Sequence, residues 1–161
     1  MKKSQKKILP HSQAKLDLYQ KYLEKYFAIL GLAKSVTKVN IYDLFCGTGI
    51  YEDGKEGSPI LAFRKIQENR EFFKKNNWSQ KPITLTVNDS DPLKITSVQH
   101  YIESHNTAKA CDLTFTSESV ATLFPKLVNE LSSQNDRERN LLLSSISKCN
   151  RVDFRLIRLW P

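Results

Sequence analysis

Residues 39–49 read VNIYDLFCGTG, and this stretch decides the fold. Residues 39–45 are mostly β-branched or aromatic, a composition typical of a strand. The run stops at Gly47 and Gly49, which predicts a glycine turn directly after the strand. In an open α/β sheet, ligands bind outside the carboxyl ends of the strands, so we expect a site at this turn.

The pattern outward from this stretch alternates between helix and strand. Apolar side chains recur every three or four residues from about Ser12 to Leu30, which predicts a long N-terminal helix with Ser12 as its N-cap and Gly31 just past its end. After the turn we expect helices at about 58–74, 93–102 and 120–131 and strands at 83–87, 113–116 and from 140 onward. This order predicts an α/β protein with a parallel sheet covered by helices.

A polar loop at residues 50–57 separates the glycine turn from the next helix. Ser58 is the expected N-cap of that helix and Pro59 its first residue, because a Ser hydroxyl accepts an orphan amide and Pro has none. A dinucleotide fingerprint fits poorly, since its third glycine falls on Glu52 and Asp89 lies 40 residues beyond Gly49. No phosphate-binding P-loop motif occurs either.

Composition indicates one soluble domain of 161 residues without a membrane span or a secretory signal. Cysteines at 46, 111 and 149 form no disulfide framework, which favours the reducing cytoplasm. The formal net charge is +8, but the first nine residues carry +4 and the last fourteen +3. We therefore expect residues 1–10 to be a flexible basic arm, and nucleic-acid binding by the folded body is only weakly supported.

The turn matches the D-x-F-x-G-x-G sequence of Rossmann-like, S-adenosylmethionine-dependent methyltransferases. Asp43, Gly47 and Gly49 would approach the methionine part of that cofactor, and Asp89 would accept the ribose hydroxyls. Residues 89–92, DSDP, resemble the acidic step at the end of the second strand of that class. The resemblance implies six cofactor-binding residues, namely Asp43, Phe45, Gly47, Thr48, Gly49 and Asp89. The catalytic residues stay open.

Residues 11–66 resemble one particular family with a methyltransferase-like fold. An H-x-x-x-K helix start at His11 and Lys15, the turn, and an acidic loop closed by GSP at 57–59 are similar to the three-Cys-motif partner protein family, TcmP. Members of that family resemble bacterial methyltransferases in fold and pair with a separate iron–sulfur protein that bears a three-cysteine motif. The resemblance implies that such a protein is the partner here, while the substrate is not established by it.

The family pattern is lost after residue 143, where no acidic-proline step follows the fourth strand. We therefore expect residues 11–143 to be the N-terminal part of an incomplete methyltransferase-like sheet and 144–161 to be an atypical tail of a truncated or frameshifted product. Such a chain is expected to be inactive alone. The alternative functions are a non-catalytic scaffold for the three-Cys-motif protein and a nucleic-acid accessory factor.

Each candidate residue also has a structural interpretation. Asp43 is either a ligand or a cap for the amides of its own turn, and Asp89 is either a ribose ligand or a turn acid, with Asp91 as a helix N-terminal charge. Cys46 is expected to be a packed residue and not a nucleophile. The remaining polar candidates are expected at the surface, and no metal site is expected: Glu52, Asp53, His11, His100 and His105.

Overall fold

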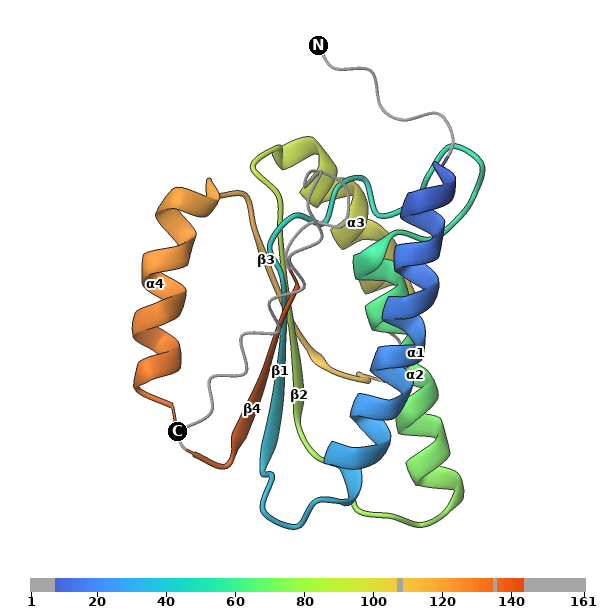
Figure 1. The fold of residues 1–161 in the computed structure, drawn as a ribbon, viewed down its shortest axis with the longest axis vertical. Coiled ribbons are helices and arrows are strands. Elements are labelled where there is room, and N and C mark those ends of the chain that lie inside the picture. The colour runs from blue at the N-terminus through green and yellow to red at the C-terminus, as the bar shows by residue number, and fades with distance from the viewer. Residues whose placement is uncertain (1–7, 107–108, 135, 144–161) are drawn as a thin grey trace.

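The computed structural model describes residues 8–106, 109–134 and 136–143, and these form a four-stranded, all-parallel sheet (Figure 1). The strand order is β3-β2-β1-β4. The elements are α1 (Pro10–Leu32), β1 (Lys38–Asp43), α2 (Ser58–Lys75), β2 (Ile83–Asn88), α3 (Pro92–His105), β3 (Asp112–Thr116), α4 (Val120–Ser132) and β4 (Glu138–Leu143). The sheet and the alternating order confirm the predicted parallel α/β fold, which is Rossmann-like.

Helices cover both faces of the sheet. Helices α1, α2 and α3 lie on one side and α4 lies on the other (Figure 1). The chain runs outward from β1 through β2 to β3 and then crosses to the opposite side of β1 to form β4. The strand order therefore reverses between β1 and β4, and the turn after β1 lies at this reversal, where open α/β sheets bind ligands.

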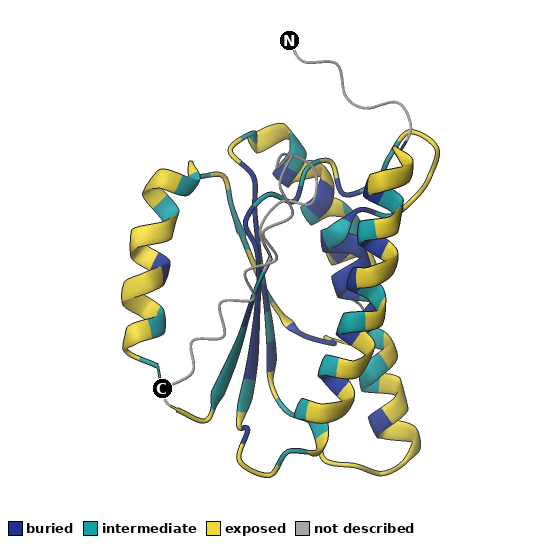
Figure 2. Ribbon diagram, viewed as in Figure 1, coloured by how far each residue is buried: buried dark blue, intermediate teal, exposed yellow. Residues whose placement is uncertain are grey.

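The main core lies between the sheet and the three helices on its more heavily covered side (Figure 2). Strand β1 is buried from Val39 to Asp43, as expected for the inner strand of a parallel sheet. Strand β2 alternates between buried and half-buried residues up to Val87. This matches the alternation of apolar and polar residues from which the strand was predicted. On the other face α4 buries only Leu127 fully, so that side carries a much smaller apolar cluster.

Two details of α1 differ from the prediction. The N-cap is Leu9 and not Ser12, because Pro10 already occupies the first helical position and fixes a helical φ there. Ser12 is a buried residue of the first turn. Gly31 lies inside the last turn of α1 and not beyond it. A Cβ at this position would overlap the ring of Phe73, so the glycine allows α1 to pack closely on α2.

Two of the sequence predictions concern the ends of the chain. Residues 1–7 of the expected arm and the whole expected tail, 144–161, lie outside the described residues. Ile8 belongs to the core and Pro10 begins α1. Strand β1 ends at Asp43, two residues earlier than the apolar run suggested, because the backbone turns at Leu44. Within the described ranges, no helix combines the length and apolar character needed to cross a bilayer.

We predict that replacing Gly31 with Ala destabilises the protein. In an ordinary helix interior this change stabilises by up to about 1 kcal/mol. Here the new methyl group would meet the buried Phe73 ring, and overpacking costs about 1–3 kcal/mol. Urea unfolding of the wild type and Gly31→Ala measures the difference. The double variant Gly31→Ala/Phe73→Leu should recover part of the loss, and a more stable Gly31→Ala protein would contradict the packing.

Candidate functional site

The turn at residues 44–49 contains two glycines in left-handed backbone conformations. Gly47 has φ +62° and Gly49 has φ +75°, a region that side chains with a Cβ rarely adopt. At Gly49 a Cβ would also lie 2.7 Å from Val98 Cγ2, so this glycine permits close packing of the turn on α3. At Gly47 a Cβ would meet nothing within 4 Å. The backbone at Gly47 is therefore open to close approach by another molecule.

Asp43 ends β1 with its side chain buried, at 1% relative exposure. Its Oδ1 accepts the Phe45 amide at 3.3 Å, and its Oδ2 accepts the Ser58 hydroxyl at 2.6 Å. The predicted N-cap role of Ser58 is therefore wrong. Gly57 is the N-cap of α2 and makes no side-chain bond, whereas the Ser58 hydroxyl donates to the carboxylate that it meets at the base of the turn. Asp43 thus joins β1, the turn and the start of α2.

Asp89 follows β2 and connects two loops. Its Oδ2 accepts the Gly47 amide at 3.1 Å, and its Oδ1 accepts the Asp91 amide at 3.0 Å. Lys94 of α3 approaches Oδ1 at 3.4 Å. Asp91 is the N-cap of α3 and accepts the Leu93 amide at 3.1 Å. The turn after β1 is therefore held directly by the acid after β2, 42 residues later in the chain.

Asn88 is a residue beside the candidate site whose bonding role the sequence interpretation missed. It is fully buried at the end of β2, where its side-chain amide donates to the carbonyl oxygens of Leu44 and Glu118, both at 3.1 Å. Its Oδ1 accepts the Thr116 hydroxyl at 2.9 Å and the Glu118 amide at 3.0 Å. One side chain thus binds the ends of β1, β2 and β3. The available signal was a polar amide in the last, inward-facing position of an alternating strand.

Burial sets the electrostatics of the turn. Burial raises the pKa of Asp43 to about 6, although the bonds from Ser58 and Phe45 lower it, and the nearby charge of Asp89 raises it further. Burial also raises the pKa of the Cys46 thiol, helped by the charges of Asp43 and Asp89. Cys46 is therefore a protonated, packed residue at neutral pH, as predicted from the sequence.

Tyr19 of α1 has a buried side-chain hydroxyl. Burial raises the pKa of Tyr19, and the charge of Asp43 is the next largest cause. The Tyr19 hydroxyl has no hydrogen-bond partner among the described residues. A buried hydroxyl without a hydrogen-bond partner is unusual. Because the charge of Asp43 acts on Tyr19, the long N-terminal helix places a polar group within electrostatic reach of the turn.

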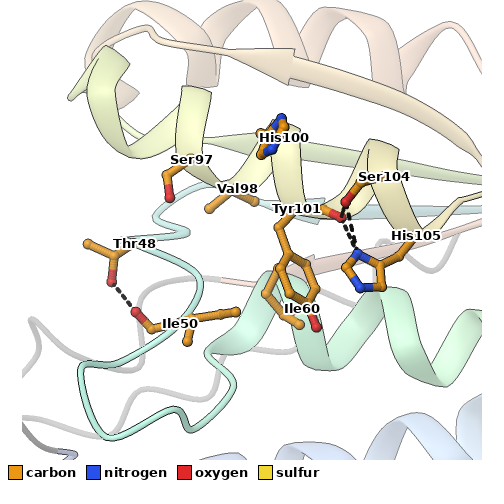
Figure 3. A pocket seen from close by; sticks show the side chains of 9 residues that line it. All are labelled: Thr48, Ile50, Ile60, Ser97, Val98, His100, Tyr101, Ser104 and His105. Carbon is orange, nitrogen blue, oxygen red and sulfur yellow. Dashed lines mark hydrogen bonds between the residues drawn. The ribbon is translucent and has the colours of Figure 1, made fainter.

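A cavity of about 420 Å³ lies beside the turn, between the loop that follows it and α3 (Figure 3). The lining residues are Thr48, Ile50, Ile60, Ser97, Val98, His100, Tyr101, Ser104 and His105. Neither Asp43 nor Asp89 lines it. Thr48 is the residue shared by the predicted cofactor turn and this cavity, and its hydroxyl donates to the Ile50 carbonyl at 3.0 Å.

The six predicted cofactor residues divide into two groups. Asp43, Gly47 and Asp89 are brought together by direct bonds and electrostatic coupling, with half-buried Phe45 in the same turn. Thr48 and Gly49 lie further along the turn, Thr48 at the cavity and Gly49 against Val98 of α3. The predicted surface residues are exposed: Glu52, Asp53, His11, His100 and His105. In the described part of the chain, no three His, Cys, Asp or Glu residues cluster as a metal site would require.

No protein-family model matches the chain, and a search of the curated proteins finds no match either. This is a Rossmann-like α/β protein whose first strand ends in a glycine turn at the point where the strand order reverses.

We predict that Asp43 makes folding stability fall as pH rises from about 4 to 6. Because the folded pKa of about 6 exceeds the ordinary value of 3.8, the folded protein holds this proton more tightly than the unfolded chain. The contribution is complete below pH 4 and lost above pH 6, and two pKa units correspond to about 3 kcal/mol. Urea unfolding of the wild type and Asp43→Asn between pH 4 and 7 isolates this effect from other titrating groups.

The quantity compared is the free energy of unfolding of Asp43→Asn minus that of the wild type. We expect this difference to rise by about 2–3 kcal/mol between pH 4 and 7, because only the wild type loses the contribution of the Asp43 proton. Asp17→Asn, at an exposed position of α1, is the matched control and should show no such shift. A difference between wild type and Asp43→Asn that stays constant with pH would contradict the buried, proton-holding environment of Asp43.

Proposed function

We propose that this protein binds S-adenosylmethionine at the carboxyl edge of β1 and β2, as a methyltransferase-like protein of the TcmP type. The observation that carries the proposal is the 3.1 Å bond between the Gly47 amide and Asp89 Oδ2. It joins the glycine turn and the acid after the second strand, which are the two parts of the cofactor motif in the sequence. Both lie beside the reversal of strand order, where ligand sites form in open α/β sheets.

The turn fits a cofactor that needs close backbone approach. The left-handed backbone of Gly47 has open space where a side chain would stand. Thr48 beside it is exposed, so a ligand reaches this part of the turn from solvent. When bound, S-adenosylmethionine supplies an electrophilic methyl group, and the residues named here only hold it.

Asp89 could accept both ribose hydroxyls if its contact with Lys94 were replaced. Its oxygens accept the amides of Gly47 and Asp91, and Lys94 contributes the longest of its three contacts at 3.4 Å. A carboxylate has about four lone-pair positions. One ribose hydroxyl would therefore donate to the remaining lone-pair position. The second would replace Lys94, while the bonds from the Gly47 and Asp91 amides stay in place.

Asp43 has a different role in this proposal. At 1% exposure, with both oxygens bonded to Phe45 and Ser58, it is a positioning residue that shapes the turn and does not touch the ligand. The loop-cap interpretation of Asp43 is thus compatible with cofactor binding, because the cap holds the glycines in the conformation that a ligand would meet.

The resemblance also supplies the proposed partner, a separate three-Cys-motif iron–sulfur protein. The chain's own Cys46 and Cys111 are buried and free, so they offer no cluster ligands at the surface. We assign no residue to the methyl acceptor. The function proposed for this chain is therefore cofactor binding within such a pair.

We predict that calorimetric titration of the full chain with S-adenosylmethionine gives saturable binding, and that Asp89→Asn weakens it at least about tenfold, as expected for lost bonds to a charged acceptor. Lys94→Met should strengthen binding, because it removes the group that competes for Asp89 Oδ1. Asp17→Asn is the control with the same change in charge and should bind like the wild type.

Circular dichroism of each variant separates loss of binding from loss of fold. Absence of binding by the folded wild type at millimolar cofactor would refute the proposal. Equal affinity of the wild type, Asp89→Asn and Lys94→Met would refute the role of Asp89 while leaving another binding mode.

A further inference from the structure

One face of α3 carries an unusual stripe of uncharged polar side chains. The stripe residues recur at helical spacings of three and four: Ser97, His100, Tyr101, Ser104 and His105. All five line the cavity, and Figure 3 shows the side chains of Tyr101 and His105 directed from α3 toward α2. Charged residues make up 26% of the chain, yet among the described residues no Asp, Glu, Lys or Arg lines this cavity. The apolar stripe of α3, Ile95, Val98 and Ile102, is a separate, buried one.

The cavity combines an apolar base with polar edges. Val98 and Ile60 are buried core residues that reach its lining, and Ile50 adds apolar surface from the loop. The volume of about 420 Å³ lies within the range of small-molecule sites. An apolar base with a few polar groups at the edge is the usual composition of such sites.

The orientation of His105 is fixed by its neighbours. Its Nδ1 lies 2.7 Å from the Tyr101 carbonyl oxygen and 3.0 Å from Ser104 Oγ, as Figure 3 shows. A carbonyl oxygen only accepts, so in neutral His105 the proton is on Nδ1 and the lone pair is on Nε2. The imidazole also stacks on the Tyr101 ring, with centroids 4.3 Å apart and planes at 20°. Nε2 is therefore a preorganised acceptor on an exposed residue.

Thr48 supplies a second acceptor across the cavity. Its hydroxyl hydrogen is donated to the Ile50 carbonyl, which leaves the lone pairs of Oγ1 for another donor. Ser97 and His100 also line the cavity and carry side chains that both donate and accept. The polar edge thus offers fixed acceptors and adaptable groups, and within the described ranges it has no Asp, Glu, Lys or Arg to compensate a charged ligand.

We propose that this cavity binds a neutral nitrogen heterocycle with N–H or amino donors, the chemistry of a nucleobase. The planar ring packs on the apolar base, and its donors meet His105 Nε2 and Thr48 Oγ1. The site adjoins the proposed cofactor site and shares Thr48 with it, but Asp89, the proposed ribose ligand, does not line it. A free nucleoside and a base of single-stranded nucleic acid share this chemistry.

The test is calorimetric titration of the full chain with cytidine and adenosine. Two variants address the cavity. His105→Phe keeps an aromatic ring on Tyr101 but removes Nε2, and Ser97→Trp fills the space from an exposed helix position. We expect millimolar or tighter binding by the wild type, a loss of about tenfold in His105→Phe for the lost hydrogen bond, and no binding by Ser97→Trp. His11→Phe, on exposed α1 surface, is the matched control and should bind normally.

Failure of this inference is distinguishable from failure of the proposed function. S-adenosylmethionine binding should be unchanged in His105→Phe, which weakens cytidine binding. No nucleoside binding by the folded wild type would overturn the inference, as would equal binding by wild type and Ser97→Trp. Nucleoside binding lost in Asp89→Asn but kept in His105→Phe would also overturn it. A single-stranded oligonucleotide that competes more strongly than cytidine, and depends on His105, would identify nucleic acid as the source of the base.

Discussion

The Asn88 side chain holds together the edge of the sheet on which every proposed activity depends. Its amide bonds to the Leu44 carbonyl after β1 and to the Glu118 carbonyl after β3, while its own strand is β2. A polar group buried without partners costs about 1–3 kcal/mol, so the three strand ends must keep a fixed relative position to satisfy it. With that position fixed, Asp89, the next residue, reaches the Gly47 amide.

Asp43 and Asp89, at the ends of neighbouring strands, both accept hydrogen bonds from the protein's own backbone amides. Asp43 is fully enclosed and holds the Phe45 amide, whereas Asp89 keeps one weak contact, Lys94, that a ligand can replace. Under the proposed function, this difference assigns a structural role to Asp43 and a ligand-binding role to Asp89. Preorganisation of the turn reduces the entropy that a bound molecule must overcome, which favours binding through backbone groups.

Local sequence predicted the fold well, because strand and turn signals depend on neighbouring residues. The β-branched run before Gly47 and the alternation in β2 were sufficient to predict a parallel α/β protein with a glycine turn. The role of Ser58 was not predictable, since a hydroxyl that caps a helix and one that meets a distant carboxylate look identical in sequence. The Asn88 bonds and the His105 tautomer likewise depend on residues that only the folded chain brings close.

The Gly47 amide reports most directly on whether the acid after β2 holds the turn after β1. Hydrogen exchange measured by NMR under native conditions follows this single proton. With the bond to Asp89 in place, we predict that the Gly47 amide is protected in the wild type and exchanges at least about tenfold faster in Asp89→Ser, as for loss of a bond worth more than 1 kcal/mol. The Cys46 amide, bonded to the Asn88 carbonyl, should remain protected. A Gly47 amide that exchanges freely in the wild type would contradict this structure of the site.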